Sequence, residues 1–486
     1  MGTERWYHLK VEPRPDGMNP NPNAYDVIVI GAGPAGEVLA GRCAEGGLRV
    51  AIVERELVGG ECSYWGCMPS KALLRPGDVL AAARRVPGAD GAVTGTVDAA
   101  ATFEVRDSFT GGWDDTGQLP WLTERGIDVV RGTGRLAGER TVEVEGPDGR
   151  RTTLTAARAV AVATGTAAAV PPIPGLEDAR PWTNREATAA KEVPGRLVVI
   201  GGGAIGLEMA QAFRRLGAAE VTVIEAAPRL LMSEEPFAGD EVRSALEAEG
   251  IAVHTGAEVT AVERRGPGGP VTVTLAAGAS FTGDELLVAT GRRPATGDLG
   301  LDTVGLEPGR SVPVDDQLRA AGSDGPLPWL YAVGDCNGRV LLTHMGKYQA
   351  RVAGDVILGR EGAATSDHRA VPRVTFTDPQ VCAVGLTEAE AREAGLPVDT
   401  VTHATGAVAG AALAGQPFPG TSQLVVDRQR RILVGATFVG PGVQELLHSA
   451  TIAVAAEVPL DRLWHAVPSF PTVSEVWLRL LEAYGL

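Results

Sequence analysis

Two cysteines in the segment from Gly59 to Lys71 have the residue type and spacing for redox chemistry. The segment reads GGECSYWGCMPSK, with Cys62 and Cys67 five positions apart. On a regular α-helix, residues five apart lie roughly 8–9 Å from each other, beyond the about 7 Å between Cα atoms that a disulfide spans. A bridge therefore needs irregular backbone, which the flanking glycines and Pro69 supply. We interpret the pair as a redox-active disulfide that opens a helix, where the helix dipole and Lys71 would stabilise a thiolate.

Two other interpretations of the cysteine pair stay open at this point. The cysteines could be buried free thiols, or they could be half of a metal site. Zinc ligands usually come in pairs with about two to four residues between them, and a second pair is needed. The sequence has no other Cys or His pair with that spacing, and we expect no metal.

Composition and charge exclude several classes of protein. The chain has 486 residues and a formal charge of −16, and its length suggests about three domains. Nucleic acid and anionic membranes are bound through basic patches, so we expect neither as a partner. No apolar run approaches the about 20 residues of a membrane helix, and the N-terminus lacks a signal-peptide pattern. The odd set of five cysteines does not fit a secreted disulfide framework. We therefore expect a cytoplasmic protein.

A dinucleotide-binding pattern follows a proline-rich segment at residues 1–24, which we predict to be a disordered tail. YDVIVIGAGPAG is a buried parallel strand running into a turn with Gly31, Gly33 and Gly36, and the next strand ends on Glu54. Such glycines permit a tight turn and close approach of a pyrophosphate to a helix N-terminus, while the acid accepts a hydrogen bond from a ribose hydroxyl. The order of strand, glycines, helix and acid predicts dinucleotide binding.

The same dinucleotide-binding pattern occurs a second time. LVVIGGGAIGLEMA places Gly201, Gly203 and Gly206 after a strand, and the following strand ends on Glu225. Each unit is closed by a strand running into Ala-Thr-Gly, at Thr164 in the first and at Thr290 in the second. The first unit is longer by an insertion that contains the cysteine segment. The duplication predicts two dinucleotide folds rather than one large sheet.

The C-terminal part has a different pattern. From about Val371, strands occur without glycine fingerprints, and two helices follow. In the last helix one apolar stripe recurs at helical spacing, and we interpret it as a core or dimer face. The stripe consists of Val473, Val476, Trp477, Leu480, Leu481 and Tyr484.

From about Tyr25 onward the chain resembles the flavoprotein disulfide reductases, which include dihydrolipoamide dehydrogenase and glutathione, mycothione and mercuric reductases. The matching motifs are GAGPAG, GGECSYWGCMPSK, ATG, GGGAIGLE, ATGRRP, YAVGDC, TFTDPQVCAVGLTE and PTVSE. The resemblance implies an α/β protein with two Rossmann-like dinucleotide-binding domains and a C-terminal α+β dimerisation domain, assembled as a homodimer. The implied bounds are 25–170 with 295–365 for FAD, 171–294 for the nicotinamide nucleotide, and 366–486 for the interface.

The resemblance also implies which residues bind the cofactors. FAD would be held by Gly31, Gly33, Pro34, Ala35, Gly36, Glu54, Gly60, Lys71, Gly134, Thr164, Gly165 and Asp335, with Leu342, Thr343 and His344 starting a helix that points at the flavin. The nicotinamide nucleotide would be held by Gly201, Gly203, Ala204, Ile205, Gly206, Glu225, Val259 and Gly291. Glu225 would accept from a free ribose hydroxyl and repel a 2′-phosphate, so NAD is expected rather than NADP, although Arg229 could soften the choice.

The family's catalytic residues map onto five positions. Lys71 and Glu208 match a charged pair beside the reacting nitrogen of the flavin. Cys67 would be the thiol against the flavin, and Cys62 the outer thiol that exchanges with substrate. Glu475 matches a glutamate that follows the family's acid-base histidine by five residues.

The acid-base histidine itself is missing. In the family this histidine precedes a proline and acts across the dimer, whereas here Phe470 precedes Pro471. Phenylalanine carries no proton, and general acid-base help is typically worth about 10²–10⁴-fold, so lipoamide or glutathione turnover should be poor. His465 could be a displaced base or could simply pack.

The expected activity is passage of electrons from NADH through FAD and the Cys62–Cys67 disulfide to a small disulfide or thiol-reactive acceptor. Tyr64 and Trp65 replace the small residues usual in this loop, and they either pack or line an aromatic pocket for a quinone. One alternative is therefore a quinone or dye reductase that acts directly from the flavin, and another is a flavin-binding homologue with impaired catalysis. Mercuric and thioredoxin reduction need a further C-terminal redox pair, and no cysteine follows Cys382.

Overall fold

The structure is a computed structural model that describes residues 21–323 and 325–486. Most of the predicted tail, residues 1–20, lies outside the described residues. The backbone contacts divide the chain into two compact units, each assembled from separated segments. Unit 1 consists of residues up to Gly60, Asp114–Ala167 and Arg293–Ala364, and unit 2 consists of Glu61–Trp113, Ala168–Arg292 and Thr365–Leu486.

Unit 1 is built on a twisted parallel sheet. Its parallel strands, in the spatial order β17-β6-β1-β2-β3, are β17 (Gly325–Ala332), β6 (Arg151–Val162), β1 (Ala24–Ile30), β2 (Val50–Glu54) and β3 (Asp128–Arg131). Antiparallel strands extend it, namely β16 (Arg319–Gly322) beside β17 and the hairpin of β4 (Thr133–Leu136) and β5 (Thr141–Glu145) beside β6. The apolar run of β1 is buried on both faces, as a central parallel strand requires.

Two separate cores cover the faces of this sheet. Alternate residues of β1, Val27 and Val29, pack with helices α1 (Pro34–Glu45) and α9 (Thr343–Ile357). Ile28 and Ile30 point to the other face and pack with the apolar residues of the β4–β5 hairpin. The period of two along the strand thus decides which core each side chain enters.

The nucleotide-binding part of unit 2 repeats the arrangement of unit 1. Its parallel strands, in the order β10-β9-β8-β14, are β10 (Ile251–His254), β9 (Glu220–Ile224), β8 (Arg196–Ile200) and β14 (Glu285–Val288). The order corresponds strand for strand to β3-β2-β1-β6 of unit 1. Helices α7 (Ala204–Leu216) and α8 (Pro236–Ala248) belong to this fold, and an antiparallel sheet follows it, made of β11 (Val259–Arg264), β12 (Val271–Leu275) and β13 (Ser280–Gly283).

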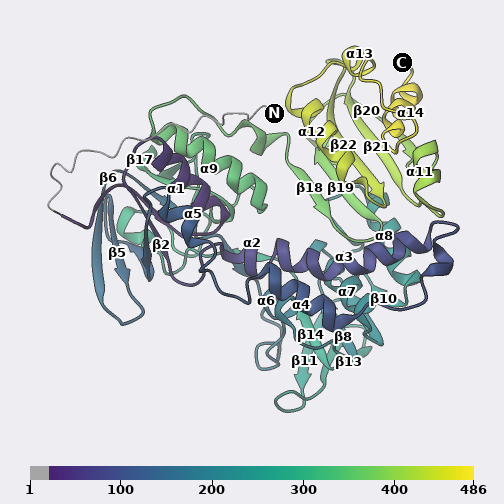
Figure 1. Cartoon of the computed structure of the whole chain (residues 1–486), viewed down its shortest axis with the longest axis horizontal. Helices are drawn as coiled ribbons and strands as arrows, with labels where there is room; N and C mark the ends of the chain where they lie inside the picture. Colours follow the sequence, from purple (N-terminus) through teal and green to yellow (C-terminus); the bar gives the residue numbers. More distant parts are fainter. Residues whose placement is uncertain (1–20, 324) are drawn as a thin grey trace, which may run out of the picture. The chain divides into compact units, whose positions relative to one another are not determined.

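The helix that starts at the second cysteine packs on this nucleotide-binding part. Helix α3 (Cys67–Arg84) contacts α7 and α4 (Ala99–Phe109), and Figure 1 shows it running beside both. Its Leu73 and Leu74 are buried in one core with Phe213 of α7 and Phe103 of α4. The insertion therefore joins the hydrophobic core of unit 2.

The C-terminal part of unit 2 is an antiparallel sheet with two longer helices packed on one face. The strand order is β18-β19-β22-β21-β20, with bounds Pro372–Thr375, Gln380–Gly385, Ile432–Gly440, Thr421–Asp427 and Val398–Ala404. Helices α12 (Leu447–Ala455) and α14 (Glu475–Tyr484) share one core with this sheet. Val476, Trp477, Leu480 and Leu481 are buried there, so the predicted stripe serves the core of its own domain.

The remaining elements are short. They are α2 (Gly60–Tyr64), η1 (Asp90–Ala92), α5 (Leu119–Thr123), β7 (Thr166–Ala168), α6 (Asn184–Ala189), β15 (Arg292–Pro294), η2 (Leu301–Val304), η3 (Asp335–Asn337), η4 (Thr365–His368), α10 (Glu388–Glu393), α11 (Ala409–Ala414), η5 (Val443–Leu446) and α13 (Leu460–Leu463). Among the described residues no helix is long and apolar enough to cross a membrane.

Candidate redox and dinucleotide-binding sites

The two cysteines lie on either side of a break between two helices. Cys62 lies within α2, and Cys67 is the first residue of α3. Gly66 separates the helices with φ −126° and ψ −115°, a conformation outside the helical range. Cys62 is half-buried and Cys67 is exposed. The irregular backbone that the spacing required is therefore present, and it places Cys67 at the start of an 18-residue helix.

The Lys71–Glu208 pair predicted from the motifs is formed. The Lys71 Nζ atom lies 2.7 Å from Glu208 Oε2, and the backbone N–H of Phe376 donates to Glu208 Oε1 at 2.9 Å. The Lys71 ammonium also lies 4.6 Å from the centre of the Phe376 ring, within cation–π range. Glu208 is 4% exposed, so both of its oxygens are satisfied inside the protein. The ion pair lies one helical turn beyond Cys67.

The glycine turn of unit 1 has the close contacts that its motif requires. Gly31 has φ +104°, and a Cβ there would lie 2.5 Å from the carbonyl oxygen of Ala163. A Cβ on Gly36 would lie 1.9 Å from the carbonyl oxygen of Gly31. Gly33, in contrast, faces open space at the N-terminus of α1, where Pro34 takes the first helical position. Two glycines therefore pack the turn, and the third leaves the helix N-terminus open to an anion.

The acids at the ends of β2 and β9 have matching environments. Glu54 accepts hydrogen bonds from the backbone N–H groups of Ala32 at 2.8 Å and Glu56 at 2.7 Å. Glu225 accepts from Gly202 at 2.5 Å and Ala227 at 2.7 Å, which are the corresponding positions of the second unit. Each carboxylate is thereby held beside its glycine turn, where a ribose would lie.

The other residues predicted for FAD come from the strand ends and α9 of unit 1. The hydroxyl of Thr166 donates to Asp335 Oδ2 at 2.8 Å. Leu342 is the extended N-cap residue of α9, and Thr343 and His344 form its first turn. Gly134 lies on β4, and Gly165 and Gly60 have positive φ angles. These residues share unit 1, except that Lys71 belongs to unit 2.

The residues of unit 1 fit an FAD. The hydroxyl oxygen of Thr164 is buried and has no hydrogen-bond partner within the described chain. A buried polar group of this kind normally has a partner, so it points to a ligand atom. Together with the open N-terminus at Gly33, it marks a site suited to a dinucleotide.

The turn predicted for the nicotinamide nucleotide repeats that geometry in unit 2. A Cβ on Gly206 would lie 2.2 Å from the carbonyl oxygen of Gly201, whereas Gly203 faces open space at the start of α7. Ala204 and Ile205 begin that helix, Val259 begins β11, and Gly291 follows β14. All of the residues predicted for this nucleotide belong to unit 2.

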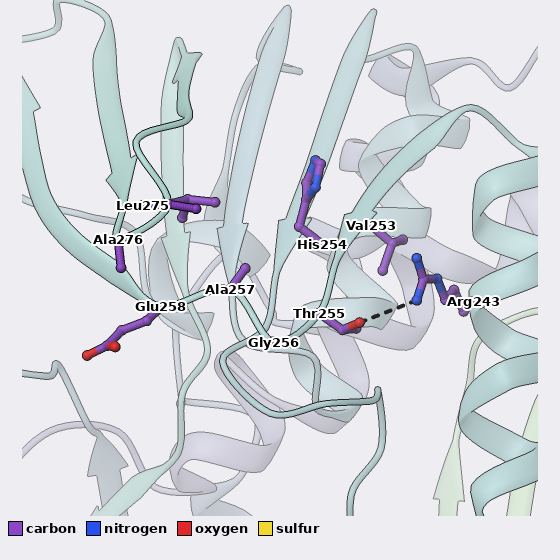
Figure 2. Close-up of a pocket in the computed structure, with 10 residues that line it drawn as sticks. Arg243, Val253, His254, Thr255, Gly256, Ala257, Glu258, Leu275 and Ala276 are labelled. Atoms are coloured by element: carbon purple, nitrogen blue, oxygen red, sulfur yellow. Dashed lines mark hydrogen bonds between the residues drawn. The ribbon is translucent and has the colours of Figure 1, made fainter.

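A cavity of about 480 Å³ in unit 2 is lined by the end of β10 and the segment that follows it, together with Arg243 of α8. Figure 2 shows its wall, with the guanidinium of Arg243 directed at the Thr255 hydroxyl, which is 3.3 Å away. The wall segment is tied to Glu225, whose backbone N–H donates to the carbonyl of His254 and whose carbonyl accepts from Ala257. Backbone hydrogen bonds therefore join the segment that lines this cavity to Glu225, and the segment's last lining residue, Glu258, directly precedes Val259.

Arg229 does not reach toward that site. Its guanidinium donates to the backbone carbonyls of Leu230, Leu231, Met232 and Glu234 at 2.8–3.2 Å. The side chain thus shapes the loop after Glu225 and uses its donors there.

The position of the family's histidine is occupied by Phe470, which carries no acid or base. Phe470 is 77% exposed, and His465 is exposed five residues before it. Glu475 is 6% exposed, and its Oε2 atom is buried without a hydrogen-bond partner within the described chain. The carboxylate at the family's glutamate position therefore has an acceptor oxygen that no described residue uses.

Sequence reasoning missed several residues that contact the redox loop, Glu61 or Glu208. Asn184 and Arg185 contact Trp65, which lies between the cysteines. Arg292 contacts Glu61, which directly precedes Cys62, and Phe376 contacts Glu208. Phe376 lies in the quoted TFTDPQ motif and Arg292 in ATGRRP, so the motifs located these two residues without revealing their contacts. Asn184 and Arg185 carry no motif signal.

Comparisons with known proteins agree with this geometry. Residues 25–350 match the family described as pyridine nucleotide-disulphide oxidoreductase, and residues 371–480 match its dimerisation domain. A dihydrolipoyl dehydrogenase from Chlorobaculum tepidum is 35% identical over 457 residues, which cover 93% of this chain and 95% of that protein. A mercuric reductase from Staphylococcus aureus is 31% identical over 455 residues, which cover 93% of this chain and 81% of that protein.

A solved structure is similar to this chain over nearly its whole length. The Cu(II) complex of the HOCl-induced flavoprotein disulfide reductase RclA from Escherichia coli superposes with a TM-score of 0.82 at 25% identity, over 95% of this chain and 99% of that one. The expected fold class is confirmed, and the match to the dimerisation domain implies a homodimer. The chain therefore belongs to the pyridine nucleotide-disulphide oxidoreductase family and is an NAD(P)H-dependent flavoprotein disulfide oxidoreductase.

Proposed function

We propose that the chain reduces a small disulfide or a related thiol-reactive acceptor with NADH, through the pair Cys62 and Cys67. The observation that carries this proposal is the helix break that holds both cysteines, one turn before the buried Lys71–Glu208 pair. FAD, when bound by the glycine turn of unit 1, supplies the two-electron carrier between the nicotinamide and the disulfide. The expected domain bounds and cofactor residues remain part of this proposal.

The proposed reaction of the cysteine pair conserves electrons and protons. Opening the Cys62–Cys67 disulfide takes two electrons and two protons, of which NADH provides both electrons and one proton and the solvent provides the other. The Cys62 thiolate then attacks the acceptor disulfide, forms a mixed disulfide and releases the first acceptor thiol. Cys67 attacks the Cys62 sulfur, which releases the second thiol and restores the intramolecular disulfide.

Two contacts support NADH as the reductant. Two backbone N–H groups hold the Glu225 carboxylate beside the glycine turn, where it would accept a hydrogen bond from the 2′-hydroxyl of a bound NADH. The Arg229 guanidinium donates to backbone carbonyls, and it would have to break these hydrogen bonds to bind a 2′-phosphate. Both contacts oppose NADPH.

A quinone or dye reductase is the second candidate. The exposed Phe470 ring in place of a histidine favours an acceptor that needs no acid-base help from that position. Trp65 adds a second aromatic ring in the redox loop, which packs against Tyr64 with 5.7 Å between ring centres and has Arg185 over one face.

Serine substitutions of the cysteines separate the candidates. The holoprotein is assayed with NADH against a panel of small disulfides and a panel of quinones, before and after Cys62→Ser, Cys67→Ser and the double substitution. A disulfide reductase loses disulfide turnover in all three variants. Quinone turnover that survives the double substitution, without any disulfide turnover in the native protein, would establish the second candidate. Failure of NADH to bleach the flavin of the native holoprotein would refute both and indicate a homologue with impaired catalysis.

A further inference from the structure

The break between the two cysteine helices interrupts the hydrogen bonds of the backbone. In a continuous α-helix each carbonyl accepts from the N–H of the residue four positions later. For the carbonyl of Trp65 that residue is Pro69, which has no N–H. The carbonyl of Tyr64 belongs to the last residue of α2, and the non-helical Gly66 follows two positions later. Both carbonyls are therefore terminal acceptors, which proteins satisfy with side chains or with water.

The side-chain amide of Asn184 contacts both ends of the segment between the cysteines. Its Nδ2 atom donates to the carbonyl of Trp65 at 2.8 Å and to Glu61 Oε1 at 2.8 Å. An amide NH₂ group has two N–H donors, so a single group makes both hydrogen bonds. Glu61 directly precedes Cys62, and Trp65 lies two residues before Cys67. Asn184 therefore joins the two ends of the redox loop.

Asn184 is itself firmly held. It is 6% exposed and is the first residue of α6. The hydroxyl of Thr183 caps this helix by accepting from the N–H of Arg185, and Glu186 completes a capping box. The carbonyl of Asn184 accepts from the hydroxyl of Thr188 at 2.8 Å. The amide is thus presented to the redox loop from a fixed helix start.

Trp113 donates to the neighbouring carbonyl of the loop. Its indole N–H lies 3.2 Å from the carbonyl oxygen of Tyr64. Two cations lie over its ring, the guanidinium of Arg106 at 5.2 Å and the ammonium of Lys191 at 4.4 Å from a ring centre. Arg106 is fully buried and donates to the carbonyl of Ala190 at 2.8 Å. Two successive carbonyls between the cysteines therefore accept from side chains that are distant in sequence.

We propose that Asn184 is a positioning residue for the cysteine pair, supported by Trp113. Their N–H groups hold the backbone between Cys62 and Cys67 in the broken-helix form that a disulfide requires. A regular helix would place these residues roughly 8–9 Å apart, beyond the about 7 Å between Cα atoms that a disulfide spans. The inference rests on the proposed function and deepens it, because Cys67 must reach the Cys62 sulfur to restore the disulfide after each turnover.

Loss of the Asn184 amide should affect the disulfide and the dithiol differently. The disulfide itself enforces the helix break, so the carbonyl of Trp65 would lose its donor while its backbone stays in place. The dithiol imposes no such constraint, and its backbone can rearrange until that carbonyl meets water. The disulfide form is therefore destabilised relative to the dithiol. Two hydrogen bonds are involved, and we expect about a tenfold change in the equilibrium constant between the two forms.

The test measures this equilibrium in the holoprotein, anaerobically and without NADH, in mixtures of reduced and oxidised dithiothreitol. In the exchange the Cys62–Cys67 bond breaks, the ring disulfide of dithiothreitol forms, and two thiol protons pass to the protein thiols. Alkylation followed by mass spectrometry gives the fraction of each form. Asn184→Ala should favour the dithiol about tenfold more than the native protein does, which makes the reduction potential about 30 mV less negative.

A second variant removes the other donor. Trp113→Phe keeps an aromatic ring beside Arg106 and Lys191 but has no indole N–H for the carbonyl of Tyr64. Because one hydrogen bond is lost instead of two, it should favour the dithiol by about threefold.

The matched control is Thr183→Ala. It removes the cap of the same helix, and the hydrogen bonds of Thr183 go to Glu186 and Arg185 rather than to the redox loop. Both alanine variants should lower the thermal midpoint, but Thr183→Ala should leave the equilibrium constant unchanged. A native equilibrium constant in Asn184→Ala, or an equal shift in Thr183→Ala, would overturn the inference. If Asn184→Ala does not fold, Trp113→Phe decides, and a native value there would overturn the inference.

This readout is separate from the serine test of the proposed function. Exchange with dithiothreitol needs neither NADH nor an acceptor. A protein whose disulfide takes no part in turnover would fail the serine test, yet it would still show the shift in Asn184→Ala.

Discussion

The buried ion pair on the redox helix leads to an asymmetric prediction about stability. Lys71→Met leaves the Glu208 carboxylate at 4% exposure with the Phe376 N–H as its remaining donor. Glu208→Gln leaves Lys71, whose side chain is 34% exposed and can turn its ammonium toward water. We therefore expect Lys71→Met to be the more destabilising of the two substitutions.

The expected losses of unfolding free energy follow from how deeply Lys71 and Glu208 are each buried. Removing one partner of a buried pair costs about 3–5 kcal/mol, and the retained Phe376 N–H places Lys71→Met near the lower limit, at about 3 kcal/mol. Glu208→Gln should cost about 1 kcal/mol, as for a partly exposed pair. The double substitution leaves no buried charge and should cost about 1–2 kcal/mol. The coupling between the two sites is then about 2–3 kcal/mol.

Thermal unfolding of the holoprotein, followed by tryptophan fluorescence, measures these differences. At about 2–4 °C per kcal/mol, Lys71→Met should lower the midpoint by about 6–12 °C and Glu208→Gln by about 2–4 °C. The control is Arg392→Met, which breaks the exposed Arg392–Glu388 pair of similar length, 2.6 Å, and should change the midpoint by less than about 2 °C. The reasoning is refuted if Glu208→Gln costs as much as Lys71→Met, or if the two effects add in the double variant.

Four further predictions concern the cofactor, the missing base, a buried carboxyl and assembly. Steady-state kinetics should give a kcat/KM at least about tenfold higher with NADH than with NADPH, and Glu225→Gln should narrow that ratio; equal values in the native protein would contradict it. Phe470→His should raise disulfide turnover by at least about tenfold through general acid-base catalysis. The gain should shrink when Glu475→Gln removes the negative charge of that carboxylate, and no gain in Phe470→His would show that the position lies away from the thiols. Burial of Asp78 raises its pKa from 3.8 to about 6, because this effect exceeds the opposing effect of Arg215. The folded state therefore holds the Asp78 proton more tightly than the unfolded state, and the free energy of unfolding of the native protein relative to Asp78→Asn should fall by about 2–3 kcal/mol as the pH rises from about 4 to about 6. Denaturant unfolding that shows a pH-independent difference between the two proteins would contradict this prediction. Light scattering at micromolar concentration should give the mass of a dimer, with a monomer mass as the contrary result.

The sequence by itself determined the fold class and the two dinucleotide turns. Gly31 and Gly36 are specified locally, because the turn brings their Cα atoms within contact of neighbouring carbonyls and no larger residue fits. The acid at the end of each second strand is predicted by the same local pattern, because strand, glycine turn and helix follow one another directly in the sequence. The spacing of Cys62 and Cys67 likewise predicted a break in the helix, because the distance along a helix is fixed by its geometry.

Only the tertiary structure decided which distant residues meet. Arg185 lies 124 positions from Glu61, and their contact depends on how α6 packs beside the redox loop rather than on any local pattern. The same holds for Phe376, which reaches Glu208 over 168 positions. The stripe of α14 is a related case, because helical spacing shows that a face is buried but not against what, and here it packs on β20 and β21 of its own domain. Periodicity and motifs record local geometry, whereas partners across the fold are selected by packing and charge in three dimensions.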